Sequence, residues 1–213
     1  MVQIYETAVL GGGCFWCLEA VYQEVDGVFS VESGYSGGQV PDPSYEQVCS
    51  KATGHAEVVR IKFNPARLSY REILEIFFVI HDPTTLNRQG NDIGPQYRSV
   101  IFCQSPEQER TARAVVAELQ RQGIAPVVTE IAPATSFYRA EEEHQNYYRL
   151  HPNQGYCAFV VAPKLEKFRR TFVQKNAPIQ IRGCQRFYSA VSQFNSCPTA
   201  TSPTVAVTCM AEP

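Results

Sequence analysis

A run of three glycines at residues 11–13 most constrains how this chain can fold. The apolar stretch before it, residues 2–10, has the character of a short strand. After it, apolar residues recur at helical spacing from Cys14 until Asp26 and Gly27 interrupt the pattern. The order of strand, glycine turn and helix predicts that Cys14 lies at the N-terminus of a helix.

Similar patterns continue along the chain. They predict strands over residues 56–64, 99–103 and 127–132, and a strand that runs into a glycine-rich loop over 28–38. They predict helices over 69–81, 105–123 and the middle of 137–153. The order βαββαβ, followed by a further helix and strand, predicts an α+β fold. We expect a two-layer sandwich with a ferredoxin-like core, in which helices pack on a mainly antiparallel or mixed sheet. Long loops should meet at one edge of that sheet, where an active site can form.

The length of 213 residues suits one domain with an appendage. From Gly183 onward the only charged residues are Arg186 and Glu212, and Ser, Thr and Pro accumulate. We therefore expect one folded domain over residues 1–177 and a flexible C-terminal tail over 178–213. This tail contains Cys184, Cys197 and Cys209.

Charge and hydropathy exclude several classes of partner. The formal net charge is −2 and no cluster of Lys and Arg stands out, so we expect no nucleic acid partner. The N-terminus lacks a basic segment with a long apolar run, and no later stretch approaches the roughly 20 apolar residues of a membrane helix, so we expect a cytoplasmic protein that does not enter membranes. We also expect a monomer. Eight cysteines are more than a reducing compartment usually keeps, which indicates that some of them are reactive.

Cys14 is the first candidate for a reactive group. The partial positive charge of a helix N-terminus stabilises a thiolate, so we expect a lowered pKa and a nucleophilic role. Other interpretations remain open: Cys14 and Cys17 can be small buried hydrophobic residues, a thiol–disulfide exchange pair, or part of a redox-sensing or metal-binding module. A zinc ribbon would need a second C-x-x-C or a paired histidine motif, and the sequence has neither.

Several polar residues lie in loops that the predicted topology can bring to the same sheet edge. A carboxylic acid and two phenols beside one thiol would suit acid catalysis on an oxygen atom. Each residue also has an ordinary interpretation as a cap or a core tyrosine. The residues concerned are Tyr45, Glu57, Asp92 and Tyr97.

Six motifs, taken together, resemble the A-type peptide methionine sulfoxide reductases. The resemblance runs from about residue 7 to residue 175. The motifs are GCFW, GYSGG, PSYEQVCS, TGHAEVV, HDPTTLNRQGNDIGPQYRS and HQNYY. The resemblance implies a peptide-methionine (S)-S-oxide reductase that repairs oxidised methionine, free or in proteins.

The resemblance also implies catalytic roles for particular residues. Cys14 would attack the sulfoxide sulfur, and Glu57 would protonate the oxygen. Tyr45 and Tyr97 would hydrogen-bond that oxygen, while Asp92 would orient the substrate or a water molecule. The reaction would leave Cys14 as a sulfenic acid.

Substrate contacts and cofactors follow from the same resemblance. Phe15 and Trp16 would surround the methyl group of the substrate, and His144 would line the same site. No metal, flavin or nucleotide is expected, because the reductant is thioredoxin or another external dithiol.

The choice of the resolving thiol remains open. The commonest family form has glycine after the tryptophan, and Cys17 stands there instead. Cys157 matches the position from which many family members supply the resolving cysteine. Cys17 is nearer, because three residues along a helix place its Cα about 5–6 Å from that of Cys14. A cysteine of the tail is the third alternative.

Overall fold

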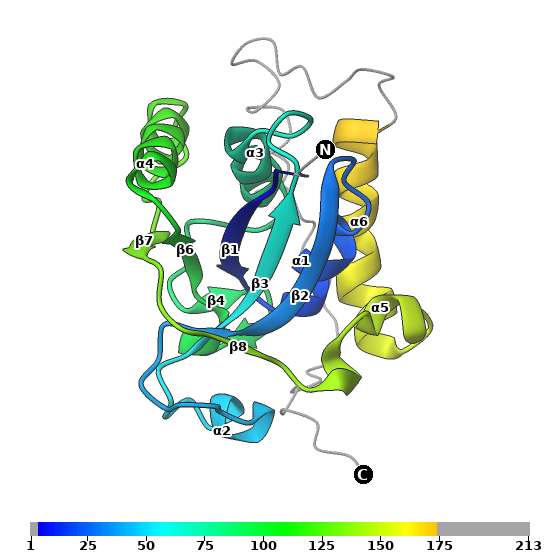
Figure 1. The fold of residues 1–213 in the computed structure, drawn as a ribbon. Helices are drawn as coiled ribbons and strands as arrows, with labels where there is room; N and C mark the ends of the chain where they lie inside the picture. The colour runs from blue at the N-terminus through cyan, green and yellow to red at the C-terminus, as the bar shows by residue number, and fades with distance from the viewer. Residues whose placement is uncertain (1–3, 174–213) are drawn as a thin grey trace.

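The computed structural model describes residues 4–173, in which helices pack against a six-stranded sheet (Figure 1). The strands of this sheet are β1 (Glu6–Gly12), β2 (Val28–Ser36), β3 (Ala56–Phe63), β6 (Ser99–Cys103), β7 (Glu130–Pro133) and β8 (Phe137–Arg139). The helices are α1 (Phe15–Tyr22), α2 (Tyr45–Cys49), α3 (Tyr70–Ile80), α4 (Pro106–Arg121), α5 (Tyr147–Leu150) and α6 (Ala162–Phe168). A small hairpin consists of β4 (Arg88–Gln89) and β5 (Asp92–Ile93).

The sheet order confirms the predicted architecture. The order is β7-β6-β1-β3-β2-β8, and every pair is antiparallel except β6 with β7. The four central strands with α1 and α3 form the βαββαβ series of a ferredoxin-like core. The α+β class and the mixed sheet are therefore both confirmed.

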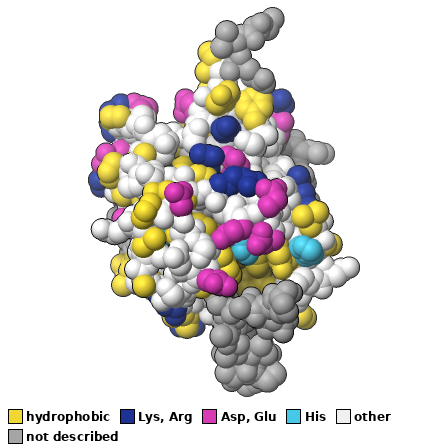
Figure 2. Space-filling view, turned by 60° about the horizontal axis from the view of Figure 1, so that its bottom comes forward, with side chains coloured by type: hydrophobic (Ala, Val, Ile, Leu, Met, Phe, Trp, Pro, Cys, Tyr) yellow, Lys and Arg dark blue, Asp and Glu magenta, His cyan; other side chains and the backbone are white. Residues whose placement is uncertain are grey.

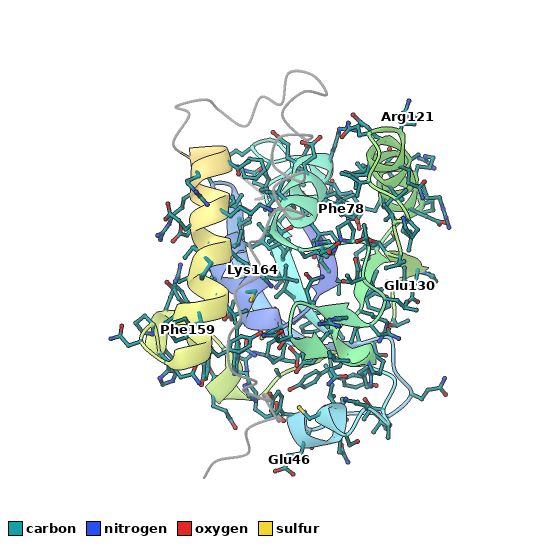
Figure 3. The ribbon with its side chains drawn as sticks, turned by 180° about the vertical axis from the view of Figure 1, so that it is seen from behind. Glu46, Phe78, Arg121, Glu130, Phe159 and Lys164 are labelled. Carbon is teal, nitrogen blue, oxygen red and sulfur yellow. The ribbon has the colours of Figure 1, made fainter. Side chains whose placement is uncertain are left out.

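The main hydrophobic core lies between the sheet and the helices. Helices α1, α3 and α6 cover one face of the sheet, and Figure 3 shows α3 and α6 from that side. Phe77 and Phe78 of α3 are fully buried there, together with Leu18 of α1 and Phe168 of α6. The other face has a smaller apolar cluster, against which Phe137 packs. The core thus fixes α1 firmly against the sheet.

The glycine turn places the start of α1 directly after β1, as the sequence predicts. A Cβ atom added to Gly12 would lie 2.8 Å from Phe77 Cε2. Gly13 has a φ of +92°, and its added Cβ would lie 2.5 Å from Gln89 Cγ. Only glycine allows this close approach and this conformation. Cys14 is the residue that precedes the first helical residue of α1.

The prediction of a helix in the middle of residues 137–153 is largely wrong. This segment contains the short strand β8, one 3₁₀ turn at Glu142–His144 and the four-residue α5. Asn146 adopts a left-handed conformation with φ of 55°, which interrupts any continuous helix. Side chains from other elements bind the backbone here, so tertiary contacts override the local pattern.

The strand predicted over residues 127–132 begins later than expected, at Glu130. The N–H of Val128 donates instead to the carbonyl of Pro83 at 2.8 Å. This bond ties residue 128 to the loop after α3 rather than to β6.

The predicted tail and the boundary at residue 177 lie outside the described residues, as do Cys184, Cys197 and Cys209. Among residues 4–173, no helix combines the length and the apolar composition needed to cross a membrane.

Gly13 and Gly123 have nearly the same φ but different surroundings, so substitution of each by alanine tests the packing of the turn. Gly123, after α4, has a φ of +90° and nothing within 4 Å of an added Cβ. We expect Gly123→Ala to cost about 1 kcal/mol of unfolding free energy from backbone strain alone. Gly13→Ala should cost roughly 1–3 kcal/mol more, because its methyl group also overlaps Gln89. Urea denaturation measures both, and equal losses would contradict the close packing at Gly13.

Candidate active site

Cys14 and Cys17 form a buried pair at the start of α1. Their exposed fractions are 6% and 1%. Burial raises the pKa of the Cys14 thiol well above its usual range, and a hydrogen bond with Cys14 lowers the pKa of Cys17 to about 7. The same hydrogen bond raises the pKa of Cys14, so the first thiolate of the pair resides on Cys17, with the Cys14 thiol as its donor.

The lowered pKa that the sequence predicts for Cys14 is therefore wrong. Removal of the thiol from water is the largest influence, and it disfavours the thiolate. The helix N-terminus is also already occupied, since the N–H of Phe15 donates to Glu57 Oε2 at 3.1 Å. A carboxyl group, not the thiol, thus receives this free N–H of α1.

Glu57 lies on β3 and is only 1% exposed. Burial raises the pKa of its carboxyl to about 8, although the hydrogen bond from Phe15 opposes this shift. At neutral pH the carboxyl is accordingly mostly protonated. It can donate a proton to a group bound beside Cys14.

Two tyrosines and a second carboxylate meet at the same place, as the sequence predicts. Burial, followed by the charge of Glu57, raises the pKa of Tyr45 and of Tyr97, and the charge of Cys14 adds to both shifts. The hydroxyls are thus neutral hydrogen-bond donors. Asp92, on β5, has its pKa raised by burial and accepts a hydrogen bond from the Tyr156 hydroxyl at 2.6 Å.

An aromatic cluster surrounds the start of α1. The Trp16 ring stacks on Tyr147, with centroids 3.7 Å apart and planes 6° apart. The His144 ring lies 5.7 Å from both Phe15 and Trp16, and 4.3 Å from Tyr45. Figure 2, in which the bottom of the molecule comes forward, shows hydrophobic side chains beside histidine and acidic side chains. The predicted substrate residues Phe15, Trp16 and His144 are therefore neighbours.

The segment 140–147 holds part of this cluster in place. Glu141 Oε1 accepts from the N–H of Tyr45 at 2.7 Å, and its Oε2 accepts from the Tyr35 hydroxyl at 2.9 Å. Gln145 Oε1 accepts from the N–H of Ser33 at 3.1 Å. These contacts tie the segment to α2 and β2, and thus set the position of Tyr45.

Sequence reasoning missed three of these residues: Glu141, Tyr147 and Tyr156. Tyr147 belongs to the motif HQNYY, and Tyr156 stands directly before Cys157, so both lie beside residues that the sequence did single out. Glu141 is one of three consecutive glutamates, and no pattern distinguishes it from its neighbours.

Cys157 lies at the start of a π-helical turn, Cys157–Val161, that continues into α6. It is fully buried, and burial followed by the charge of Cys17 raises its pKa to about 11. Figure 3 shows Lys164 on α6, and the charge of Lys164 contributes to the lowered pKa of Cys17. Cys17 thus interacts with both of the other candidate thiols, Cys14 and Cys157.

Comparison with known proteins identifies the family. A family model described as peptide methionine sulfoxide reductase matches residues 6–177. The chain is 60% identical over 179 residues to a protein from Ralstonia nicotianae named peptide methionine sulfoxide reductase MsrA, covering 81% of this chain and 94% of that protein.

Solved structures agree with this relationship. The reduced form of Mxr1 from Saccharomyces cerevisiae superposes with a TM-score of 0.69 at 35% identity, covering 74% of this chain and 91% of that one. Mxr1 in complex with Trx2 superposes with a TM-score of 0.50 at 26% identity, covering 69% and 87%. The chain is thus an enzyme that reduces methionine sulfoxide, and it belongs to the A-type peptide methionine sulfoxide reductase family.

Proposed function

We propose that this enzyme reduces the S epimer of methionine sulfoxide, with Cys14 as the nucleophile and Glu57 as the proton donor. The observation that carries the proposal is the carboxyl of Glu57, buried and bound to the backbone of Phe15, the residue next to Cys14. A neutral carboxyl in that place can protonate an oxygen atom while the adjacent sulfur attacks. The resemblance to the family motifs supports the choice of epimer.

The first step forms a sulfur–sulfur bond between Cys14 and the sulfoxide. The Glu57 proton passes to the sulfoxide oxygen, and the neutral hydroxyls of Tyr45 and Tyr97 stabilise that oxygen by hydrogen bonding. The hydroxyl then moves to the Cys14 sulfur as the new bond to methionine breaks. Methionine leaves, Cys14 becomes a sulfenic acid, and the proton released by the Cys14 thiol restores Glu57.

The aromatic cluster would bind the methyl group of the substrate. Phe15 and Trp16 offer apolar ring surface beside the reacting thiol. Two buried nitrogens here, Trp16 Nε1 and His144 Nδ1, have no hydrogen-bond partner within residues 4–173. Both atoms are closed to solvent, so a polar group of a peptide could reach them only after a shift of the cluster. Asp92 would orient the substrate or a water molecule.

Cys17 is the better first resolving thiol. In the reduced protein its side chain is hydrogen-bonded to that of Cys14, so its sulfur lies next to the sulfur that it would attack. Burial, by contrast, raises the pKa of Cys157 to about 11 and disfavours its thiolate. A Cys17 thiolate attacks the sulfenic sulfur of Cys14, a proton joins the departing hydroxide, and a disulfide and water result. Lys164 would stabilise the attacking thiolate. Cys157 would act later, by exchange with Cys17.

Thioredoxin would complete the cycle by thiol–disulfide exchange. A thioredoxin thiolate attacks the protein disulfide, and a second thioredoxin thiol releases the reduced enzyme. The complex of the related Mxr1 with Trx2 supports this partner. The cycle needs no bound metal or organic cofactor, and a cytoplasmic location with a pool of reduced thioredoxin suits it.

Substitution of the nucleophile tests the reaction. Cys14→Ser should abolish reduction of a peptide containing the S epimer of methionine sulfoxide, with dithiothreitol as reductant. The matched control Cys103→Ser, on β6, should retain activity, since Cys103 is a buried thiol outside the site. Chromatography of the peptide measures both. Full activity of Cys14→Ser, or equal reduction of the R epimer by the wild type, would contradict the proposal.

The order of the thiols is tested by one turnover without reductant. We expect peptide mass spectrometry to find a disulfide between Cys14 and Cys17 in the wild type and in Cys157→Ser. Cys17→Ser should form its first disulfide at least tenfold more slowly, and dimedone should trap the Cys14 sulfenic acid. A first disulfide between Cys14 and Cys157, formed at an unchanged rate in Cys17→Ser, would contradict this order.

Glu57→Gln removes the proton donor and keeps an acceptor oxygen for the Phe15 N–H. We expect the single-turnover rate at pH 7 to fall by roughly 10²- to 10⁴-fold. Rapid-quench kinetics measure this fall. A loss smaller than tenfold would contradict the role of Glu57 as the proton donor.

The same variant should also change how stability depends on pH. The pKa of Glu57 rises from an ordinary 4.5 to about 8 on folding, so between these values the folded protein keeps a proton that the unfolded chain has released. Wild-type stability therefore falls with rising pH in this window, by about 1.4 kcal/mol per pH unit at most. Denaturation should be measured from pH 4 to 9. The unfolding free energy of Glu57→Gln should rise relative to that of the wild type up to about pH 8 and then stay level. A constant difference would show that the pKa of the carboxyl does not rise on folding.

A further inference from the structure

Glu19 is a buried carboxyl to which the proposed reaction assigns no role. It lies on α1, one helical turn after Trp16, and is 1% exposed. Burial raises the pKa of Glu19, while hydrogen bonds from the backbone of Asn146 and Tyr147 oppose the shift. Carboxyl groups are almost never fully buried without partners, so these two contacts account for its place in the core.

The two contacts join α1 to a distant part of the chain. The N–H of Asn146 donates to Glu19 Oε1 at 2.9 Å, and the N–H of Tyr147 donates to Glu19 Oε2 at 3.2 Å. The side chain of Asn146 makes no capping hydrogen bond to α5. The N–H groups of Asn146 and Tyr147 therefore find their acceptor on another element, in the carboxyl of Glu19.

The same turn of α1 contacts Tyr147 a second time. The ring of Trp16 stacks on the ring of Tyr147 at 3.7 Å, whereas Glu19 binds the Tyr147 backbone. Figure 1 shows α5 beside α1. Because the backbone and the ring are held by one helix, a shift of the Tyr147 backbone would also move its ring away from Trp16.

We propose that Glu19 is a positioning residue for the substrate site: its carboxyl fixes the backbone of Asn146 and Tyr147 so that Tyr147 stays stacked on Trp16. The inference rests on the proposed function, which identifies this site as the pocket for the methyl group of the substrate. Glu19 acts through Tyr147 and Trp16, and it does not contact the reacting atoms.

Other contacts of the segment serve as comparisons. Gln145 Nε2 donates to the carbonyl of Ser33 at 3.0 Å, which ties the segment to β2 rather than to α1. Gln23 Nε2 donates to Asn146 Oδ1 at 2.9 Å, and this contact is exposed. Gln23→Ala thus removes a contact between α1 and the same residue 146 without touching the buried backbone bonds, which makes it the matched control.

Glu19→Gln tests the proposal, because an amide replaces one acceptor oxygen with a donor that faces a backbone N–H. Trp16 is the one tryptophan of the chain, so tryptophan fluorescence reports directly on its environment. We expect acrylamide quenching of Glu19→Gln to rise at least twofold. The KM for a methionine sulfoxide peptide should rise at least fivefold while kcat stays within twofold. Gln23→Ala should match the wild type in all three measurements.

Two results would overturn the proposal. One is Glu19→Gln with wild-type quenching and KM. The other is a loss of kcat at unchanged KM and quenching, as a purely structural role would give. If Glu19→Gln does not fold, Glu19→Asp replaces it. The shortened carboxyl should raise acrylamide quenching and KM in the same direction but by less, and wild-type values of both would again overturn the proposal. If the wild type fails to reduce the peptide, the proposed function is wrong, but the quenching result still decides whether Glu19 positions Tyr147.

Discussion

The hydrogen bond from the Phe15 N–H to Glu57 joins the two elements on which the site depends. It links the first turn of α1 to β3 at 3.1 Å, in a place where both partners are 1% exposed. A helix N-terminus offers free N–H groups that favour an acceptor. Here the acceptor is the carboxyl, so Glu57 is held beside Cys14 instead of turning toward solvent.

The exclusion of water that suits Glu57 to its proposed role as proton donor has an opposite effect on Cys14, the proposed nucleophile. Burial raises the pKa of Glu57 to about 8 and keeps its proton available, but it also raises the pKa of Cys14 and so disfavours the thiolate. Cys17 adds to this cost, because its hydrogen bond and its charge raise the pKa of Cys14 further, and the first thiolate of the pair therefore resides on Cys17. A glycine in place of Cys17 would have neither effect. The C-F-W-C variant thus changes the ionisation of Cys14, and in the proposed cycle it also changes the resolving thiol.

Much of the fold was predictable because its central elements follow from local patterns. The strand, glycine turn and helix around Cys14 are set by backbone conformations that only Gly13 permits, and hydrophobic periodicity predicts α3 and α4. The joint placement of Tyr45, Glu57 and Tyr97 was expected from topology and from the family motifs. The pKa of Cys14 was not predictable, since burial depends on residues from the whole chain that pack around the thiol.

The failed helix prediction and the proposed substrate site concern the same segment, and one cause explains both. Between residues 140 and 147 the backbone donates to Glu19, Gln145 binds β2, and Glu141 binds the N–H of Tyr45. Contacts of this kind compete with the regular bonds of a helix, and where they prevail the segment takes an irregular path. That path brings Tyr147 into a stack on Trp16, while His144 lies near the same Trp16 ring and beside Tyr45. The local sequence signal is therefore weakest where the substrate site requires several elements to meet.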